Sequence, residues 1–201
     1  VGFTFNELYP SHLTLENVSI KNNSAPIGGG LGALSGEIYL SRSLLAENEA
    51  SLGGSISLGE PFGLIVDPIL MNIIYSNILN PINSPNNIVM GNHCNMLIIN
   101  SIIRNTGIPS FDPLPNHSEL NVHAVYSNIS NDWDGLGNIN EVPLFNISDS
   151  INWFLMEDSP CIDAGIDYYE IAGNVILDIP PDQFAGNAPD MGYLKFGFYS
   201  V

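Results

Sequence analysis

Short runs in which apolar and polar residues alternate recur along the first two thirds of the chain, and no segment shows the spacing of an amphipathic helix. The runs belong to a regular repeat. Residues 23–31 and 48–56 match at an offset of 25, and residues 73–80, 98–105 and 124–131 superpose at offsets of 25 and 26. Each unit is a β-branched run followed by a turn that contains Asn. The pattern predicts an all-β fold, a parallel β-helix (β-solenoid) with about 25 residues per coil.

Parallel coils place equivalent residues directly above one another, about 4.8 Å apart. Inward aliphatic residues such as Ile78, Ile103 and Ile129 should therefore form continuous stacks. The turn asparagines should stack likewise and form an amide ladder along the axis, although Asn is also a good turn former in its own right. The predicted ladder consists of Asn23, Asn48, Asn80, Asn105 and Asn131. The apolar residue precedes Asn by three positions in the first two units and by two in the others, so a bulge or a different turn length would be needed.

The repeat sets the expected organisation of the chain. Residues 1–131 are predicted to form the coils, with a loop inserted at about 57–70, where proline and glycine interrupt the pattern. Residues 132–201 are predicted to form an irregular cap on the last coil, because a solenoid must cover its open edge to stay soluble. Twelve of the 21 acidic residues lie at or after Asp132, so this cap is expected to be acidic.

The composition narrows the choice of partners. Four Lys and Arg stand against 21 Asp and Glu, which gives a formal net charge of -17 at pH 7. Binding to nucleic acid is therefore excluded, because it requires clustered cations, and insertion into a membrane is not expected, because no uninterrupted apolar run reaches about 18 residues. Only 12% of residues are charged. In-register coils explain this low fraction, since a charge in a repeated position would repel its copy in the next coil.

Two sets of motifs resemble a known family. The N-terminal units contain Ile20-x-x-Asn23 before Gly29-Gly-Leu-Gly32, and Leu45-x-x-Asn48 before Gly53-Gly-Ser-Ile56. The C-terminal part contains Ser101-Ile-Ile-Arg-Asn105, Val125-Tyr-Ser-Asn-Ile129, Gly137-Asn-Ile-Asn140, Pro143-Leu-Phe145, Ser159-Pro-Cys-Ile-Asp-Ala-Gly165 and Pro189-Asp-Met-Gly-Tyr193. The first set resembles the repeats of polymorphic outer-membrane autotransporter passengers, and the second resembles the end of the right-handed parallel β-helix domain of secreted bacterial proteins. The resemblance implies a right-handed coil and a secreted, extracellular or cell-surface location, and it assigns no activity.

One loop has the composition of a calcium site. Oxygen-bearing side chains alternate around glycines, and Ca²⁺ takes 6–8 oxygen ligands. The candidate ligands are Asp132, Asp134, Asn138, Asn140 and Glu141. An ordinary turn of Asn, Asp and Gly is the alternative interpretation. No cofactor is required, and Ca²⁺ is the one candidate. Further along the chain, Asp158, Asp163 and Asp190 are a second candidate site, with turn capping by Asp163 and Asp190 through backbone N–H groups as the preferred interpretation.

The two cysteines leave two interpretations open. Cys94 precedes a predicted strand, and Cys161 lies in the Ser-Pro-Cys-Ile-Asp motif. In a secreted protein a disulfide between them would tie the cap to the coils. Two buried free thiols are the alternative. The aromatic residues, Trp133 and Trp153 among them, are expected to pack in the core or cap, with a sugar-stacking platform as the other interpretation.

The expected function is non-enzymatic, and no catalytic residue is assigned. A lyase acting on uronates needs clustered cations, and Lys21, Arg42, Arg104 and Lys195 are widely separated in the repeat. We expect a structural or adhesive module that stacks head-to-tail on another copy of itself or continues into further coils. One alternative is a β-helix that binds or cleaves carbohydrate, with surface glycans as partners. Another alternative is a Ca²⁺-stabilised surface-layer module.

Overall fold

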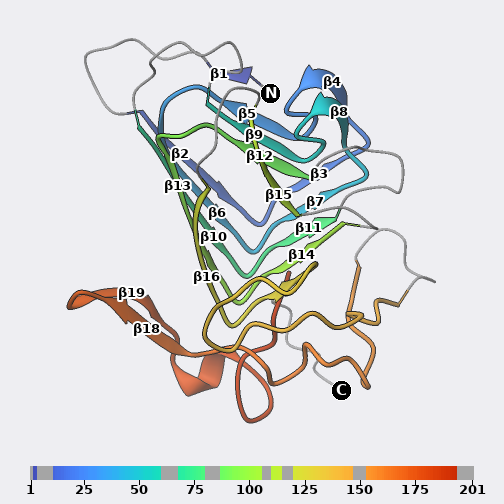
Figure 1. The fold of residues 1–201 in the computed structure, drawn as a ribbon. Coiled ribbons are helices and arrows are strands. Elements are labelled where there is room, and N and C mark those ends of the chain that lie inside the picture. Colours follow the sequence, from blue (N-terminus) through green and yellow to red (C-terminus); the bar gives the residue numbers. More distant parts are fainter. Residues whose placement is uncertain are drawn as a thin grey trace.

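The computed structural model describes residues 2–3, 11–59, 68–79, 87–105, 110–114, 120–146 and 153–193. These residues form a β-solenoid of about four turns, which confirms the all-β parallel fold predicted from the repeat. Three parallel sheets of five strands run along its axis. Seen almost end-on, two of the sheets meet in a V and the third closes the open side (Figure 1).

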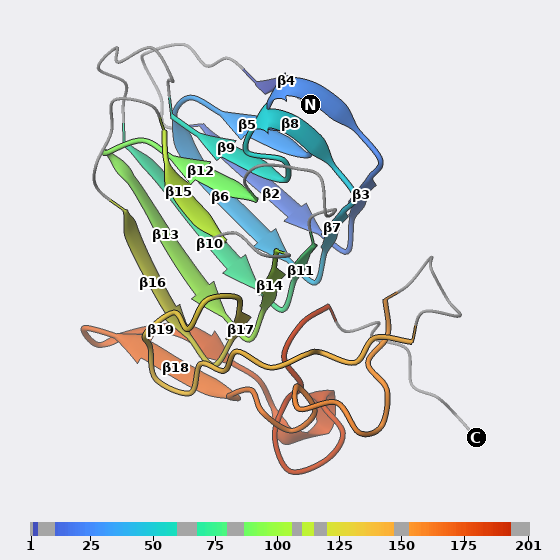
Figure 2. The same cartoon turned by 45° about the vertical axis from the view of Figure 1, so that its right-hand side comes forward.

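Each coil contributes one strand to each of the three sheets. Sheet 1 consists of β2 (His12–Glu16), β6 (Gly36–Ser41), β10 (Ile69–Ile74), β13 (Cys94–Ile99) and β16 (Asn121–Val125). Sheet 2 consists of β3 (Ser19–Lys21), β7 (Leu44–Ala46), β11 (Asn77–Leu79), β14 (Ile102–Arg104) and β17 (Asn128–Ile129). Sheet 3 consists of β1 (Gly2–Phe3), β5 (Leu31–Ala33), β9 (Ile56–Leu58), β12 (Ile88–Met90) and β15 (Phe111–Pro113). Figure 2 shows the strands of sheet 1 side by side and pointing the same way.

Smaller elements complete the fold. In the first two coils β4 (Ser24–Ile27) and β8 (Glu49–Leu52) form an extra parallel pair. Beyond the coils lie an antiparallel hairpin of β18 (Tyr168–Ile171) and β19 (Asn174–Asp178) and a short 3₁₀ turn at Pro181–Gln183. The last solenoid strand, β17, ends at Ile129, close to the boundary predicted at 131/132. The division into two domains at that point stays a prediction.

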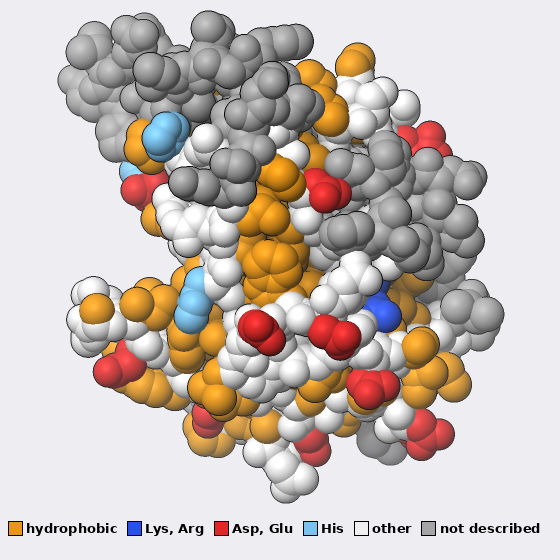
Figure 3. Space-filling model, in the orientation of Figure 1, with side chains coloured by type: hydrophobic (Ala, Val, Ile, Leu, Met, Phe, Trp, Pro, Cys, Tyr) orange, Lys and Arg blue, Asp and Glu red, His pale blue; other side chains and the backbone are white. Residues whose placement is uncertain are grey.

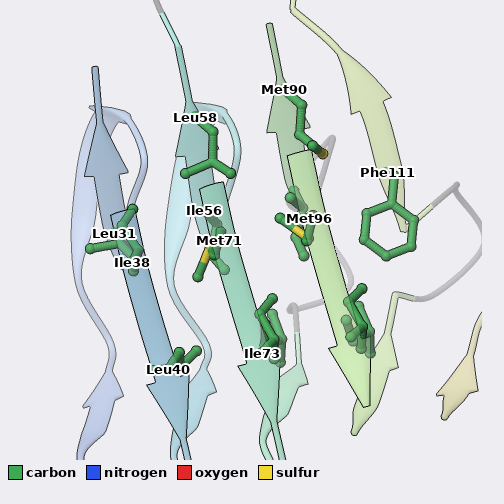
Figure 4. Close-up of a cluster of buried hydrophobic side chains, with 14 of the residues drawn as sticks. Leu31, Ile38, Leu40, Ile56, Leu58, Met71, Ile73, Met90, Met96 and Phe111 are labelled. Atoms are coloured by element: carbon green, nitrogen blue, oxygen red, sulfur yellow. The ribbon is translucent and has the colours of Figure 1, made fainter. Parts of the chain in front are cut away.

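The interior is built from stacks of aliphatic side chains. Ile78, Ile103 and Ile129 are register partners in sheet 2 and each is 0% exposed, as the repeat predicted. In sheet 1, Ile73 lies between Leu40 and Ile98 in the same way. Figure 4 shows such side chains pointing inward from neighbouring coils. Because similar aliphatic side chains stack on one another in every coil, each coil buries the apolar residues of the next.

One coil is longer than the others. Ile69 pairs with Gly36, an offset of 33 residues, whereas Cys94 pairs with Ile69 at an offset of 25. The additional residues lie between β9 and β10, which is where the loop at about 57–70 was predicted. Residues 60–67 of that loop are outside the described part of the chain.

The C-terminal region covers more than the last coil. Cys161 and Met191 pack on Leu44, Leu79 and Ile102, which belong to the outer face of sheet 2. A second cluster joins the hairpin to the outer face of sheet 1 and consists of Ile74, Tyr75, Leu97, Ile99, Val125, Leu177 and Ile179. Residues 161–193, here named the C-terminal strap, therefore run back along the side of the solenoid. The sequence had predicted a cap on the last coil only, and not a segment that also covers the side of the solenoid.

Candidate functional site

A row of buried serines follows the turn between sheets 1 and 2. Its members are Ser43, Ser76, Ser101 and Ser127, each 0% exposed. The backbone N–H of each of the first three donates to the hydroxyl of the serine one coil later, at 3.1–3.2 Å. Each hydroxyl in turn donates to the carbonyl two residues before it, at 2.6–3.0 Å. This serine ladder satisfies buried backbone groups at a point where the strands are interrupted.

Residues other than serine complete the hydrogen bonds at both ends of the serine ladder. At the N-terminal end Val18, which has no hydroxyl, donates its N–H to Ser43 Oγ at 3.2 Å. At the other end the N–H of Ser127 donates to Asn138 Oδ1 at 3.0 Å. Gly137, just before Asn138, has φ +69°, and the residue before each serine is left-handed too, with φ between 45° and 50°. Asn138 therefore takes the position of a serine in a further coil. Its side-chain oxygen accepts the last N–H of the serine ladder.

The asparagine ladder of five members is wrong as a single row. Its first two members do pair, since Asn23 Nδ2 donates to Asn48 Oδ1 at 3.0 Å. However, Ala46 is the register partner of Leu79, and Leu79 is that of Arg104, so Asn105 falls in the row of Glu47 rather than in that of Asn48. Asn80 itself is outside the described residues.

The later asparagines make other contacts. Asn105 donates its N–H to Ser130 Oγ at 2.9 Å, and Asn131 is an exposed residue in a left-handed turn with φ +69°. The sequence did contain the better signal, because the repeated segments place Ser76, Ser101 and Ser127 in one phase. Because serine is a common residue, three serines in one phase of the repeat are a weaker signal than the turn asparagines.

Three of the five candidate Ca²⁺ ligands, Asp132, Asn138 and Asn140, use their side-chain oxygens in hydrogen bonds within the protein, whereas Asp134 and Glu141 are exposed. Asn138 donates to the carbonyls of Ala124 and Trp133, and its oxygen accepts the ladder N–H. Asn140 accepts a hydrogen bond of 2.7 Å from Arg104 and donates one of 2.9 Å to Asp132. Burial lowers the pKa of Arg104. The Arg104 guanidinium thus occupies the side-chain oxygen of Asn140 that a Ca²⁺ ion would need as a ligand.

We expect EDTA to leave the melting temperature unchanged. In the part of the chain that the structure describes, no three His, Cys, Asp or Glu side chains are grouped to hold a metal. The measurement is thermal unfolding in EDTA and in excess CaCl₂. A ligand that binds only the folded state raises its stability by mass action. A melting temperature that falls in EDTA and recovers with CaCl₂ would therefore restore Asp132, Asp134 and Glu141 as metal ligands.

The disulfide considered between Cys94 and Cys161 is not formed. Both cysteines are free and buried, and they belong to different hydrophobic clusters. Cys94 lies in the interior of the solenoid, whereas Cys161 lies outside sheet 2 and accepts a hydrogen bond from Asn128 Nδ2 at 3.1 Å. Burial raises the pKa of Cys94 to about 11 and also raises the pKa of Cys161. Both therefore remain thiols at neutral pH, which makes them poor nucleophiles.

The strap is fastened to the coils by two asparagine side chains. Asn100, which is 0% exposed, donates to the carbonyl of Ile166 at 2.7 Å and accepts the N–H of Ile166 at 2.8 Å. Asn77 Oδ1 accepts the N–H of Tyr193 at 2.8 Å. A Cβ on Gly192 (φ +98°) would lie 2.4 Å from Asn77 Oδ1, so a side chain does not fit there. These contacts explain the two glycine-containing motifs near the C-terminus.

Asp163 and Asp190 accept backbone N–H groups, but from distant segments of the strap rather than from the local turns that they were expected to cap. Asp190 Oδ1 accepts the N–H of Asp163 at 3.0 Å, and Asp163 Oδ1 accepts the N–H of Asn187 at 3.1 Å. The pKa of Asp190 is raised, mainly by burial and further by the nearby Asp163 carboxylate, although the hydrogen bond from Asp163 N–H opposes the shift. The two carboxylates hold the two halves of the strap together.

The raised pKa of Asp190 predicts the pH dependence of an Asp190→Asn variant. A raised folded-state pKa means that protonation favours the folded state, and this contribution is lost as the pH rises through that value. Asn keeps the acceptor without the charge. The variant should therefore be more stable than the wild type at pH 7, by at most about 1 kcal/mol because solvent screens a partly buried group. This advantage should shrink below about pH 4. Urea unfolding at both pH values measures it, and a constant difference would contradict the assignment.

The outer face of sheet 1 carries two rows of side chains, here named the outer rows. The first outer row consists of His12, Glu37, Leu70, Asn95 and Asn121, all exposed. The second consists of Thr14, Tyr39, Asn72, Leu97 and His123. The strap covers part of the second row, because Leu97 is buried by the hairpin and His123 Nε2 lies 2.7 Å from the Tyr169 hydroxyl. The tryptophans, by contrast, pack internally: Trp133 against Phe111 and Trp153 against Phe145.

The described cations lie in separate places. Lys21 is on β3, Arg42 pairs with Glu16 at 2.9 Å, and Arg104 is on β14; Lys195 is outside the described residues. The clustered cations of a uronate lyase are thus not brought together among them. No helix in the described chain is long and apolar enough to cross a membrane. Comparison of the chain with protein-family models, curated proteins and solved structures found no match.

Proposed function

We propose that this chain is a non-enzymatic structural and adhesive β-solenoid module that acts outside the cell or on its surface. One observation supports the structural part of this proposal: the fully buried side chains of the serine ladder join each coil to the next. Such interior hydrogen bonds favour a rigid rod. The extracellular location is supported by the resemblance of the repeat and C-terminal motifs to secreted β-helix proteins.

The N-terminal coil supports a role in assembly. Strands β2, β3 and β4 stand at the ends of their sheets in the described structure. Their inward residues Leu13, Leu15 and Ile20 are only half-buried, whereas the counterparts one coil later are at most 3% exposed. At the other end, residues 136–139 already bond to the last coil. An edge with unpaired strands and apolar side chains is a template for further strands, so this edge would receive another copy or further coils.

The proposed stacking predicts filaments or oligomers that form as the protein concentration rises. The measurement combines negative-stain microscopy with X-ray scattering over a concentration series. Leu13→Lys, which places a charge on the inward side of β2, should abolish assembly. Thr14→Lys, on the outward side of the same strand, is the matched control and should assemble like the wild type. Scattering from a strict monomer at the highest concentration would reject stacking between copies.

A further inference from the structure

The centre of the outer rows combines an apolar platform with amides. Tyr39 is 38% exposed and Leu70 is 41% exposed. They lie on adjacent strands two positions apart in register, which is a diagonal that an aromatic side chain can reach. Asn72 is the register partner of Tyr39, and Asn95 is the register partner of Leu70. An exposed phenol ring thus stands beside carboxamides that both donate and accept hydrogen bonds.

The outer rows are nearly neutral on a strongly acidic molecule. Glu37 is the one carboxylate among their ten residues, and it lies 2.9 Å from His12. Glu16, further along β2, pairs with Arg42 at 2.9 Å. Asn95 and Asn121 are joined by a side-chain hydrogen bond. The whole chain nevertheless carries a formal charge of -17. A long polyanion would be repelled by this field, whereas an uncharged polymer would not.

The outer rows also form one side of a hollow. The β18–β19 hairpin projects beyond sheet 1 next to the end of β16 (Figures 1 and 2). In the space-filling view the outline of the molecule is indented directly above this hairpin (Figure 3). His123 and Tyr169 link the hairpin to the sheet. The outer rows cross the strands, so a ligand that follows a row meets the next coil about every 4.8 Å.

We propose that the outer rows bind a neutral polysaccharide lying along the solenoid axis. This inference rests on the proposed adhesive function and names its ligand class. Tyr39 stacks on the apolar face of a sugar ring, while the amides of Asn72 and Asn95 bond to its hydroxyl groups. A polymer fits better than a single sugar, because amides recur on three successive coils, at Asn72, Asn95 and Asn121.

Affinity electrophoresis in gels that contain guar galactomannan, laminarin or polygalacturonate tests the proposal. The wild type should be retarded by at least one of the two neutral polymers and not by polygalacturonate. Tyr39→Ala should weaken binding about tenfold, the value of a lost aromatic contact, and Tyr39→Phe should retain it. Tyr168→Ala is the matched control, because alternation along β18 points Tyr168 away from Tyr169 and the sheet. Each variant is first shown to melt like the wild type.

Three results would overturn the proposal: no retardation by either neutral polymer, retardation by polygalacturonate alone, or equal weakening by Tyr39→Ala and Tyr168→Ala. A parallel assay for newly formed reducing ends separates this proposal from the proposed function. Cleavage of a retained neutral polymer would refute the non-enzymatic function and still support the binding surface. Filaments without any retardation would support the structural function and refute the binding surface.

Discussion

Replacing Asn100 with alanine is expected to lower the free energy of unfolding by about 2–4 kcal/mol and to release the strap. The carboxamide makes two buried hydrogen bonds to Ile166, and losing it leaves both backbone groups of Ile166 unpaired at about 1–3 kcal/mol each, less what water recovers. Asn100 is also left-handed, with φ +50°, a conformation that Asn tolerates better than Ala. Urea unfolding measures the total loss.

A matched variant separates the two causes. Asn22 is left-handed as well, with φ +56°, but it is exposed. Asn22→Ala should therefore report the backbone contribution alone, which is well below the loss at Asn100. Hydrogen exchange should show faster exchange in residues 161–193 of Asn100→Ala while the strands of sheets 1 and 2 stay protected. Equal losses in the two variants, or unchanged exchange in the strap, would contradict the fastening role of Asn100.

Replacing Ser101 with alanine is expected to destabilise the fold by about 1–3 kcal/mol, because the buried N–H of Ser76 then has no acceptor. The carbonyl of Ile99 loses the Ser101 hydroxyl as a donor at the same time and keeps the N–H of Tyr75. Alanine is smaller and apolar, so neither steric overlap nor an added charge accounts for the loss. Chemical denaturation of the variant and the wild type gives the value.

The control for the serine ladder is Ser51→Ala. Ser51 is exposed on β8, and its replacement should change the stability by less than about 0.5 kcal/mol. Ser76→Ala should resemble Ser101→Ala, since Ser76 accepts the N–H of Ser43 in the same way. If the ladder variants were as mild as Ser51→Ala, the serines would not hold the coils together.

The repeat made the solenoid predictable, because aliphatic residues in one phase have a single parallel arrangement that buries them all. Ile78, Ile103 and Ile129 show this directly. The polar ladder was assigned to the wrong residue type. Asn is a conspicuous turn residue, but its distance from the preceding apolar residue changes by one position between the first two units and the later three, and the strand register shows that Asn48 and Asn105 do not share a row.

The strap was not predictable from the repeat, because its contacts join residues 66 and 116 positions apart. One sequence signal did point to it. Pairs such as Ile73-Ile74 and Ile98-Ile99 break the alternation expected of a strand with one exposed face. Continuous apolar runs are typical of strands that are buried on both faces. The outer partners of these pairs, Ile74 and Ile99, are the residues that the strap and hairpin cover.

The candidate calcium loop shows that a suitable amino-acid composition alone does not predict a metal site. Its residues have the right oxygen atoms, yet Asn138 and Asn140 are engaged with the backbone and with Arg104. Sequence spacing cannot show which way an amide points. The outer rows were missed for a related reason, since Tyr39, Leu70 and Asn72 are brought together only by the register between coils.

Parallel coils in fixed register are the central feature of this fold, and cysteine cross-linking tests that register directly. Ser24 and Glu49 are exposed register partners on β4 and β8, whereas Ser51 lies two positions further along β8. Directly opposed residues are close enough for a disulfide, and diagonal ones at about 7–8 Å are not. The double variant Ser24→Cys/Glu49→Cys should oxidise readily to an intramolecular disulfide, and Ser24→Cys/Ser51→Cys should stay reduced. Equal or reversed oxidation of the two pairs would contradict the parallel register on which the account is built.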